Sequence, residues 1–274
     1  MKVQVLVATI HQQDFSKVDE MNLKTDAVFA NQAGHFDYEE REYDFGKVKM
    51  ITTATKGVGV NRNIALLHGE EDILLFADDD LTYYDDYERK VLDAFKENPD
   101  ADGFLFNFRT TEGKPLGRVN KDVKVVKLHN AMAYGAINIA VKRTAIKRET
   151  IMFNTNFGGG TDFSAGEDSL FIADMLKHGL KLYTSPEFLG IVDAHLENST
   201  WFRGYNEKYF YDKGVFFRAL SSRWSCLLCL QDLLRHRKYR KNGFTFSEAF
   251  GYMKKGMKGY RDLIPYGEAY QNRK

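Results

Sequence analysis

The sequence contains few residues that cross-link a chain or break its regular structure. It has two cysteines, Cys226 and Cys229, and four prolines among 274 residues. The cysteines form a single Cys-x-x-Cys spacing with no second pair to complete a zinc site, so we interpret them as small apolar residues on one helix, in a reducing compartment. No long Gly/Ser or Pro tract suggests a linker, and we expect one large domain with at most an appendage.

Long apolar runs are also missing. No uncharged apolar stretch reaches the roughly 18 residues of a membrane-spanning helix, and the start of the chain, residues 1–7, is too short and polar for a signal peptide. Hydrophobic residues make up 43% of the chain and charged residues 28%, which are values of a globular protein. We therefore expect a folded, cytoplasmic protein.

The net charge of +1 hides an uneven distribution. Residues 223–274 carry 12 Lys and Arg against 4 Asp and Glu, a charge of +8, and residues 1–222 carry −7. We predict a catalytic domain over 1–222 and a basic, helical extension over 223–274. An apolar stretch over 224–230 followed by the basic residues 235–241 fits a peripheral helix at the inner, anionic face of a membrane. A core-packing helix with a solvated basic tip is the open alternative, and nucleic acid is disfavoured because no RNA-binding module accompanies the cluster.

Strand and helix patterns alternate along the first half of the chain. This alternation indicates an open, mostly parallel sheet, in which ligands bind at the carboxyl ends of the strands. After residue 110 the pattern is looser, with a helix that begins at Glu167 and stops at Gly179. The predicted strands are 3–10, 27–30, 48–53, 73–77, 103–108, 123–128 and 180–184, with an apolar segment at 136–141, and the predicted helices are 57–67 and 84–97.

Three consecutive carboxylates, Asp78, Asp79 and Asp80, follow the apolar strand 73–77. Adjacent carboxylates repel one another, and a hard divalent cation with oxygen ligands would relieve that repulsion. Alternate residues of an extended chain share a side, so Asp78 and Asp80 can face one ligand while Asp79 points elsewhere. The triplet predicts a metal site for a phosphorylated ligand, with a solvated acidic turn as the alternative.

Other segments carry weaker signals of the same chemistry. Arg62 lies near the start of a helix that opens with glycines, where a diphosphate could bind. An ordinary glycine-rich turn is the alternative interpretation of this segment. Glu167 and Asp168 begin a helix after the glycine-rich loop 157–161, which suits a general base or merely the helix dipole. His195 is a candidate third metal ligand or a structural histidine.

Taken in chain order, these segments resemble the family 2 glycosyltransferases with the GT-A fold. The resemblance covers roughly residues 1–220 and implies a Rossmann-like, mostly parallel sheet flanked by helices, here with a C-terminal helical extension. The segments that carry it are Val5–Thr9, Lys56–Leu66, Phe76–Asp80, Gly158–Gly160, Gly166–Phe171, His195 and Ser199–Trp201.

The resemblance also implies roles for single residues. Asp168 corresponds to the general base of inverting members, and Glu167 would orient the loop or the acceptor. Asn31 stands where many members carry an acidic residue for the uracil base, which leaves the nucleobase open. The remaining roles are donor binding by Thr9, Asn31, Arg62, Asp78 and Asp79, binding of Mn²⁺ or Mg²⁺ by Asp80, His195 and Asp78, and an acceptor side at Gly159, Gly160 and Trp201.

The implied activity is metal-dependent, inverting transfer of a sugar from a nucleoside-diphosphate sugar, most simply a UDP-sugar. The acceptor would be a hydroxyl of a glycan or of a lipid-linked molecule in surface polysaccharide synthesis. A sugar-1-phosphate nucleotidyltransferase would carry a glycine-rich basic loop after the first strand, where this chain has Thr9–Asp14. A non-catalytic nucleotide-sugar-binding module would be expected to lack Asp80 or Asp168, and both are present.

Overall fold

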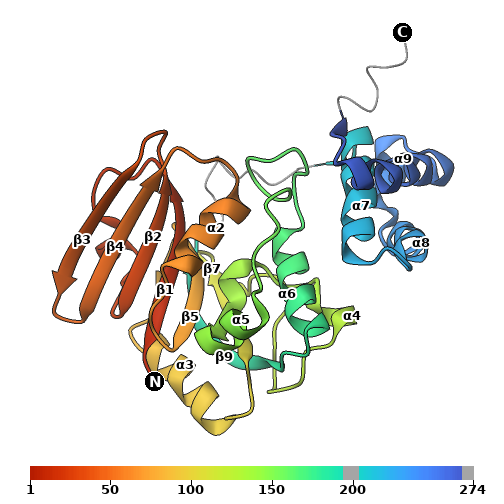
Figure 1. Ribbon diagram of the computed structural model, residues 1–274. Helices are drawn as coiled ribbons and strands as arrows, with labels where there is room; N and C mark the ends of the chain where they lie inside the picture. Colours follow the sequence, from red (N-terminus) through yellow and green to blue (C-terminus); the bar gives the residue numbers. More distant parts are fainter. Residues whose placement is uncertain (194–203, 267–274) are drawn as a thin grey trace.

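The computed structural model describes residues 1–193 and 204–266 (Figure 1). A nine-stranded sheet in the order β3-β4-β2-β1-β5-β8-β7-β9-β6 forms its body, with helices packed beside it. The predicted α/β class is confirmed. The strands are β1 Val3–Ile10, β2 Asp26–Gln32, β3 Asp37–Tyr43, β4 Gly46–Thr53, β5 Ile73–Asp78, β6 Leu81–Tyr83, β7 Gly103–Thr110, β8 Ile139–Lys142 and β9 Leu182–Val192.

The sheet is mixed in direction. Parallel pairing joins β4, β2, β1 and β5 in one block, and it joins β7 to β9. Strand β8 runs antiparallel between β5 and β7, and β3 and β6 form antiparallel edges. The expectation of a mostly parallel sheet therefore holds only for the block that contains β1 and β5, because antiparallel strands close both edges and separate the parallel parts.

Apolar side chains on both faces of the sheet explain its position between helices. Along β1, Val5 and Val7 face a core shared with α1 and α3, and Leu6 faces a second core shared with α2 and α6. Alternate residues of a strand point to opposite faces, so a continuous apolar run becomes a strand buried on both sides. The helices of this body are α1 Lys17–Glu20, α2 Val58–Leu67, α3 Tyr87–Glu97, α4 Leu128–Ala131, α5 Arg143–Glu149, α6 Glu167–Lys177 and the 3₁₀ turn η1 Ala136–Asn138.

The prediction of a strand at 123–128 is wrong. Only an isolated bridge joins Val125 to Tyr183 there. Val123 and Val125 are 44% and 52% exposed, so their apolar character does not reflect burial in the sheet. The predicted strand at 180–184 belongs to the longer β9, which continues through Pro186 to Val192.

A separate bundle of helices follows the sheet and lies to one side of it (Figure 1). It contains α7 Glu207–Leu220, α8 Ser225–Arg235, η2 Arg237–Asn242, α9 Phe246–Gly259 and η3 Tyr260–Asp262. Its core also includes Phe157 of the glycine-rich loop and Phe163, which follows that loop. Helix α7, which precedes the predicted boundary at 222, shares this core with α8 and α9. Cys226 and Cys229 lie on α8 as free thiols. None of the helices in the described residues is long and apolar enough to cross a bilayer.

Candidate active site

Strand pairing brings the predicted donor residues to one edge of the sheet. In the parallel register Ala8 lies beside Asp78, and Thr9 lies beside Asn31. The carboxyl ends of β1, β2 and β5 therefore meet where residues 78–80 begin. This edge is the expected ligand side of a parallel block.

Arg62 on α2 joins three carboxylates from two distant parts of the chain. Its Nη1 donates to Asp168 Oδ1 at 2.6 Å and to Glu167 Oε1 at 3.1 Å, and its Nη2 donates to Asp78 Oδ1 at 2.8 Å. Arg62 is 5% exposed, and its Nε is buried without a hydrogen-bond partner among the described residues. We call Arg62, Asp78, Glu167 and Asp168 the Arg62 cluster.

Charge in the Arg62 cluster is unbalanced, because one guanidinium faces three carboxyl groups. Burial alone would lower the pKa of Arg62, but Asp168, Asp78 and Glu167 together raise that pKa above its usual range. Burial raises the pKa of Asp168 to about 7, and repulsion from Glu167 and Asp78 adds to the rise that Arg62 opposes. A carboxyl group with this pKa can accept a proton near neutral pH, as a general base must.

The three aspartates after β5 have different surroundings. Asp78 binds Arg62, and Asp79 Oδ2 accepts a 2.5 Å hydrogen bond from Thr9 Oγ1. Burial raises the pKa of Asp80 to about 7, and the charges of Asp78, Asp79 and Asp193 raise it further. Asp79 thus fixes the triplet to the end of β1, whereas Asp80 lies among negative charges and forms no ion pair with a cation in the described part of the chain.

Asp193 is a site residue that the sequence reasoning missed. Its backbone N–H donates to the Asp80 carbonyl oxygen at 3.0 Å, where β9 passes beside β6. Two positions before His195, Asp193 was visible in the sequence as an acid at the end of an apolar run, but no spacing connected it with Asp80. His195 and Trp201 lie outside the described residues.

The carboxylate oxygens near Asp80 are suitable ligands for a divalent cation. Oxygen ligands and excess negative charge are what Mn²⁺ and Mg²⁺ prefer, and Asp80 is partly buried beside the charges of Asp78, Asp79 and Asp193. Within residues 1–193 and 204–266, no three His, Cys, Asp or Glu side chains converge as a complete metal-binding group. Asp80 and Asp78 could hold a metal only together with ligands from elsewhere, such as diphosphate oxygens.

Asn61, on the turn that carries Arg62, was also missed. Its Nδ2 donates to the Thr9 carbonyl oxygen at 3.0 Å, and its buried Oδ1 has no hydrogen-bond partner among the described residues. Asn31 is occupied differently, because its side chain donates to the Gln12 carbonyl and accepts from the Gln12 N–H, both at 3.0 Å. Asn31 therefore shapes the loop after β1.

The glycine-rich loop is held against both α2 and α6. The Gly159 carbonyl accepts from the Val58 N–H at 2.9 Å, so this loop caps the start of α2. Gly158 has φ of +100°, and a Cβ there would stand 2.6 Å from Glu167 Cδ. Gly160 lies against Gly57, with a would-be Cβ 3.1 Å from the Gly57 nitrogen. The predicted acceptor-side glycines, Gly159 and Gly160, thus lie against the start of α2, and their neighbour Gly158 packs on Glu167 of the Arg62 cluster.

Helix α7 fixes the other end of this loop. Asp212, which is 6% exposed, accepts hydrogen bonds from the Ser164 hydroxyl at 2.8 Å and from Lys208 at 2.5 Å. Lys208 also donates to the Asp162 carbonyl at 2.6 Å. The helical bundle therefore supports the segment that leads into Glu167 and Asp168.

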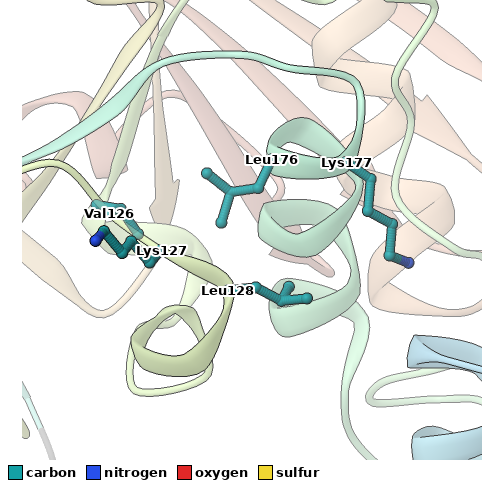
Figure 2. Close-up of a pocket in the computed structure, with 5 residues that line it drawn as sticks. All are labelled: Val126, Lys127, Leu128, Leu176 and Lys177. Atoms are coloured by element: carbon teal, nitrogen blue, oxygen red, sulfur yellow. The ribbon is translucent and has the colours of Figure 1, made fainter. Parts of the chain in front are cut away.

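A pocket of about 350 Å³ lies away from these residues, between α4 and the end of α6 (Figure 2). None of the candidate site residues lines it. Its lining residues are Val126, Lys127, Leu128, Leu176 and Lys177. We therefore centre the candidate site on the carboxyl edge of the sheet.

A family model described as Glycosyl transferase family 2 matches residues 37–163, a range that includes Arg62 and the aspartate triplet. Among curated protein sequences none matches the chain. The comparisons indicate a glycosyltransferase.

Crystal structures of S. aureus TarS share the fold of this glycosyltransferase. The TarS fragment 1–349 has a TM-score of 0.57 at 16% identity, and the same fragment in complex with UDP-GlcNAc has 0.60 at 15%; each match covers 97% of this chain and 93% of the fragment. A longer TarS structure gives 0.61 at 17% identity, with 97% of this chain and 50% of that one covered. The similarity extends over the helical bundle and supports the GT-A assignment.

Proposed function

We propose that this glycosyltransferase inverts the anomeric centre of a nucleoside-diphosphate sugar as it transfers the sugar to a hydroxyl group. The acceptor would be a glycan or a lipid-linked molecule in surface polysaccharide synthesis, at the cytoplasmic side of the membrane. The Arg62 cluster carries this proposal, because a single side chain, Arg62, joins Asp78 at the end of β5 to Asp168 on α6.

Asp168 is the proposed general base. It takes the proton of the acceptor hydroxyl while that oxygen bonds to the anomeric carbon, and the bond from this carbon to the diphosphate oxygen breaks with its electron pair on the diphosphate. Arg62 holds Asp168 in place and keeps part of its charge compensated between turnovers. Glu167 shares Arg62 and packs against Gly158, so it positions the loop beside the acceptor.

We assign Asp80 and Asp78 to a Mn²⁺ or Mg²⁺ ion, with His195 as a further ligand. When bound, such a cation offsets the negative charge that develops on the leaving diphosphate. Asp79 and Thr9 hold the triplet at the end of β1, where they would support the donor.

A UDP-sugar is the proposed donor, and UDP-GlcNAc is the first to test because a fold neighbour binds it in its crystal structure. A screen of UDP-, GDP- and dTDP-sugars would measure Mn²⁺-dependent hydrolysis and thermal stabilisation. We expect one UDP-sugar to give both responses. A response to sugar 1-phosphate with a nucleoside triphosphate, and to none of the donors, would contradict the proposal.

Asp168→Asn tests the base directly. We expect a loss of transfer by about 10²-fold or more, because an amide cannot accept the proton, while donor binding measured by calorimetry is retained. Asp174→Asn is the matched control, since Asp174 lies on the same helix, pairs with Lys177 and faces solvent. Equal turnover of the two variants would exclude Asp168 as the base.

A further inference from the structure

Helix α8 has an apolar face that the bundle does not cover. Trp224, at its start, is 54% exposed, and Leu227 and Leu234 are 56% and 54% exposed. Spacings of three and seven residues place these side chains on one side of a helix. Cys229 and Leu233, on the opposite side, are buried in the bundle core. Helix α8 is therefore packed against the bundle on one side, and its exposed apolar side chains belong to the other side.

Five exposed cations follow this face directly. Arg235 ends α8, the other four lie in the turn that joins α8 to α9, and residues 235–241 contain no Asp or Glu. Tyr239, in the middle of the turn, is fully buried and fixes the turn to the bundle. None of the five forms an ion pair with a described residue. They are Arg235, Arg237, Lys238, Arg240 and Lys241.

We propose that this surface docks the enzyme on an anionic membrane. We call Trp224, Leu227, Leu234 and the five cations the α8 surface. An apolar helix face that enters the lipid interface beside cations that meet anionic headgroups is the arrangement of interfacial helices. Trp224 suits the boundary between headgroups and acyl chains.

The charge of the α8 surface favours a membrane over a second copy of this chain. Two copies that paired through this face would bring two groups of five cations together with few apolar contacts between them. An anionic lipid surface instead complements every cation of the turn at once. In Figure 1, α8 lies on the side of the bundle that faces away from the sheet, so docking leaves the carboxyl edge of the sheet uncovered.

The test is co-sedimentation of the full chain with vesicles. We expect binding to phosphatidylcholine vesicles that contain phosphatidylglycerol, weaker binding at high salt, and little binding to phosphatidylcholine alone. Each cation near an anionic surface changes the partition coefficient about fivefold, so the K238Q/K241Q variant should bind about 25-fold more weakly. The L227Q/L234Q variant should also lose binding, since it removes the inserted side chains.

Matched controls separate this surface from general charge and hydrophobicity. K96Q/K147Q removes two exposed lysines from α3 and α5, and F36Q removes an exposed aromatic ring from the sheet body. Both should bind vesicles as the unchanged chain does. All variants should keep their thermal midpoint and their transfer to a soluble acceptor, so failure of the proposed function would be visible separately.

Several outcomes would overturn the proposal. Absence of binding to the anionic vesicles would do so, as would equal losses in the control variants. A fall in molecular mass of L227Q/L234Q at sedimentation equilibrium would show that the face joins two copies. Binding to RNA that K238Q/K241Q abolishes, without binding to vesicles, would assign the cations to nucleic acid.

Discussion

Arg62 is the residue on which the proposed site depends most. Removing one partner of a buried ion pair costs about 3–5 kcal/mol, because the other charge stays buried without compensation. Arg62→Met leaves Asp78, Glu167 and Asp168 close together without a cation. We expect a loss of that size in the free energy of unfolding near pH 8, measured with urea.

The same loss should be smaller near pH 5.5. Asp168, with a pKa of about 7, is then protonated, and fewer charges remain uncompensated. Arg89→Met is the control, since Arg89 forms exposed pairs with Asp86 and Asp93 that contribute about 1 kcal/mol or less. If the loss of unfolding free energy in Arg62→Met does not depend on pH, repulsion among the three carboxylates of the cluster is not its cause.

The pKa of Asp168 also predicts the pH dependence of transfer. Folding raises this pKa, so the carboxyl is protonated below about pH 7 and can act as a base only above it. At saturating donor and metal, turnover should rise about tenfold per pH unit up to about pH 7 and then level off. A pH–rate profile between about pH 5.5 and about pH 8.5 measures this. A flat profile would remove Asp168 from the rate-limiting proton transfer.

Folding also makes this carboxyl group a source of pH-dependent stability. The folded state binds the Asp168 proton more tightly than the unfolded chain does, since its pKa is raised from 3.8 to about 7. The sign follows from linkage: this group favours the folded state at low pH, and its contribution is lost as pH rises through that interval.

Sequence reasoning named Arg62, Asp78 and Asp168 as candidates, but it did not predict the contacts that bring them together. Arg62, Asp78 and Asp168 each belong to a short motif with a plausible chemistry. Their ion pairs depend on where α2 and α6 lie beside β5, and no local pattern carries that information. The bond between Thr9 and Asp79 was likewise outside reach, because alternation along a strand suggested only that Asp79 points away from its neighbours.

At the level of elements, burial decided which strands could be predicted. Strands β1 and β5 are apolar runs buried on both faces, and their predicted positions agree with the structure. Strand β3 was missed because all but its last residue are exposed and most are charged. Strand β9 contains Pro186, and register shifts interrupt its pairing with β7, so its pattern does not read as one long strand.

The glycine-rich loop offers a test of its packing. A Cβ at Gly158 would stand 2.6 Å from both Glu167 Cδ and Val58 Cγ1, at a φ of +100°. Gly158→Ala should displace Glu167 and lower turnover more than about tenfold. Gly113→Ala is the control: its φ is +76°, but a Cβ there meets nothing within 4 Å.

Both alanine variants should lose about 1–3 kcal/mol of stability to backbone strain, measured by thermal or urea unfolding. Only the variant at Gly158 should lose activity. If both retain full turnover, the contact between the loop and Glu167 has no role in the reaction.

For the whole molecule, the charge division at residue 222 does not coincide with a packing boundary. Helix α7 ends at Leu220, yet it packs against α9 through Gly214 and Gly256, where no Cβ would fit. The basic character of the C-terminal segment was readable from composition. Composition did not show that this segment shares a core with Phe157 and Phe163, because those residues lie far away in the sequence.

A chain that ends at residue 222 should therefore be impaired as an enzyme. It would expose the buried side of α7, including Tyr211 and Val215, and weaken the Asp212 contact that supports Ser164. We expect increased binding of a hydrophobic dye, faster proteolysis within 157–166, and loss of transfer even to a soluble acceptor. A chain that ends at residue 266 keeps all these helices and should behave normally. Equal activity of the two shortened chains would show that 1–222 functions alone.

The charged edge strand β3 has a consequence for the enzyme in concentrated solution. Strand β3, Asp37–Tyr43, consists of four acids, Arg41 and two tyrosines, and the opposite edge is only the three-residue β6. An incoming strand would meet a highly charged, mainly acidic edge strand on one side and too few backbone groups on the other. Both edge strands therefore disfavour fibril growth by strand addition. We expect thioflavin fluorescence of the stored, concentrated protein to stay at its initial value.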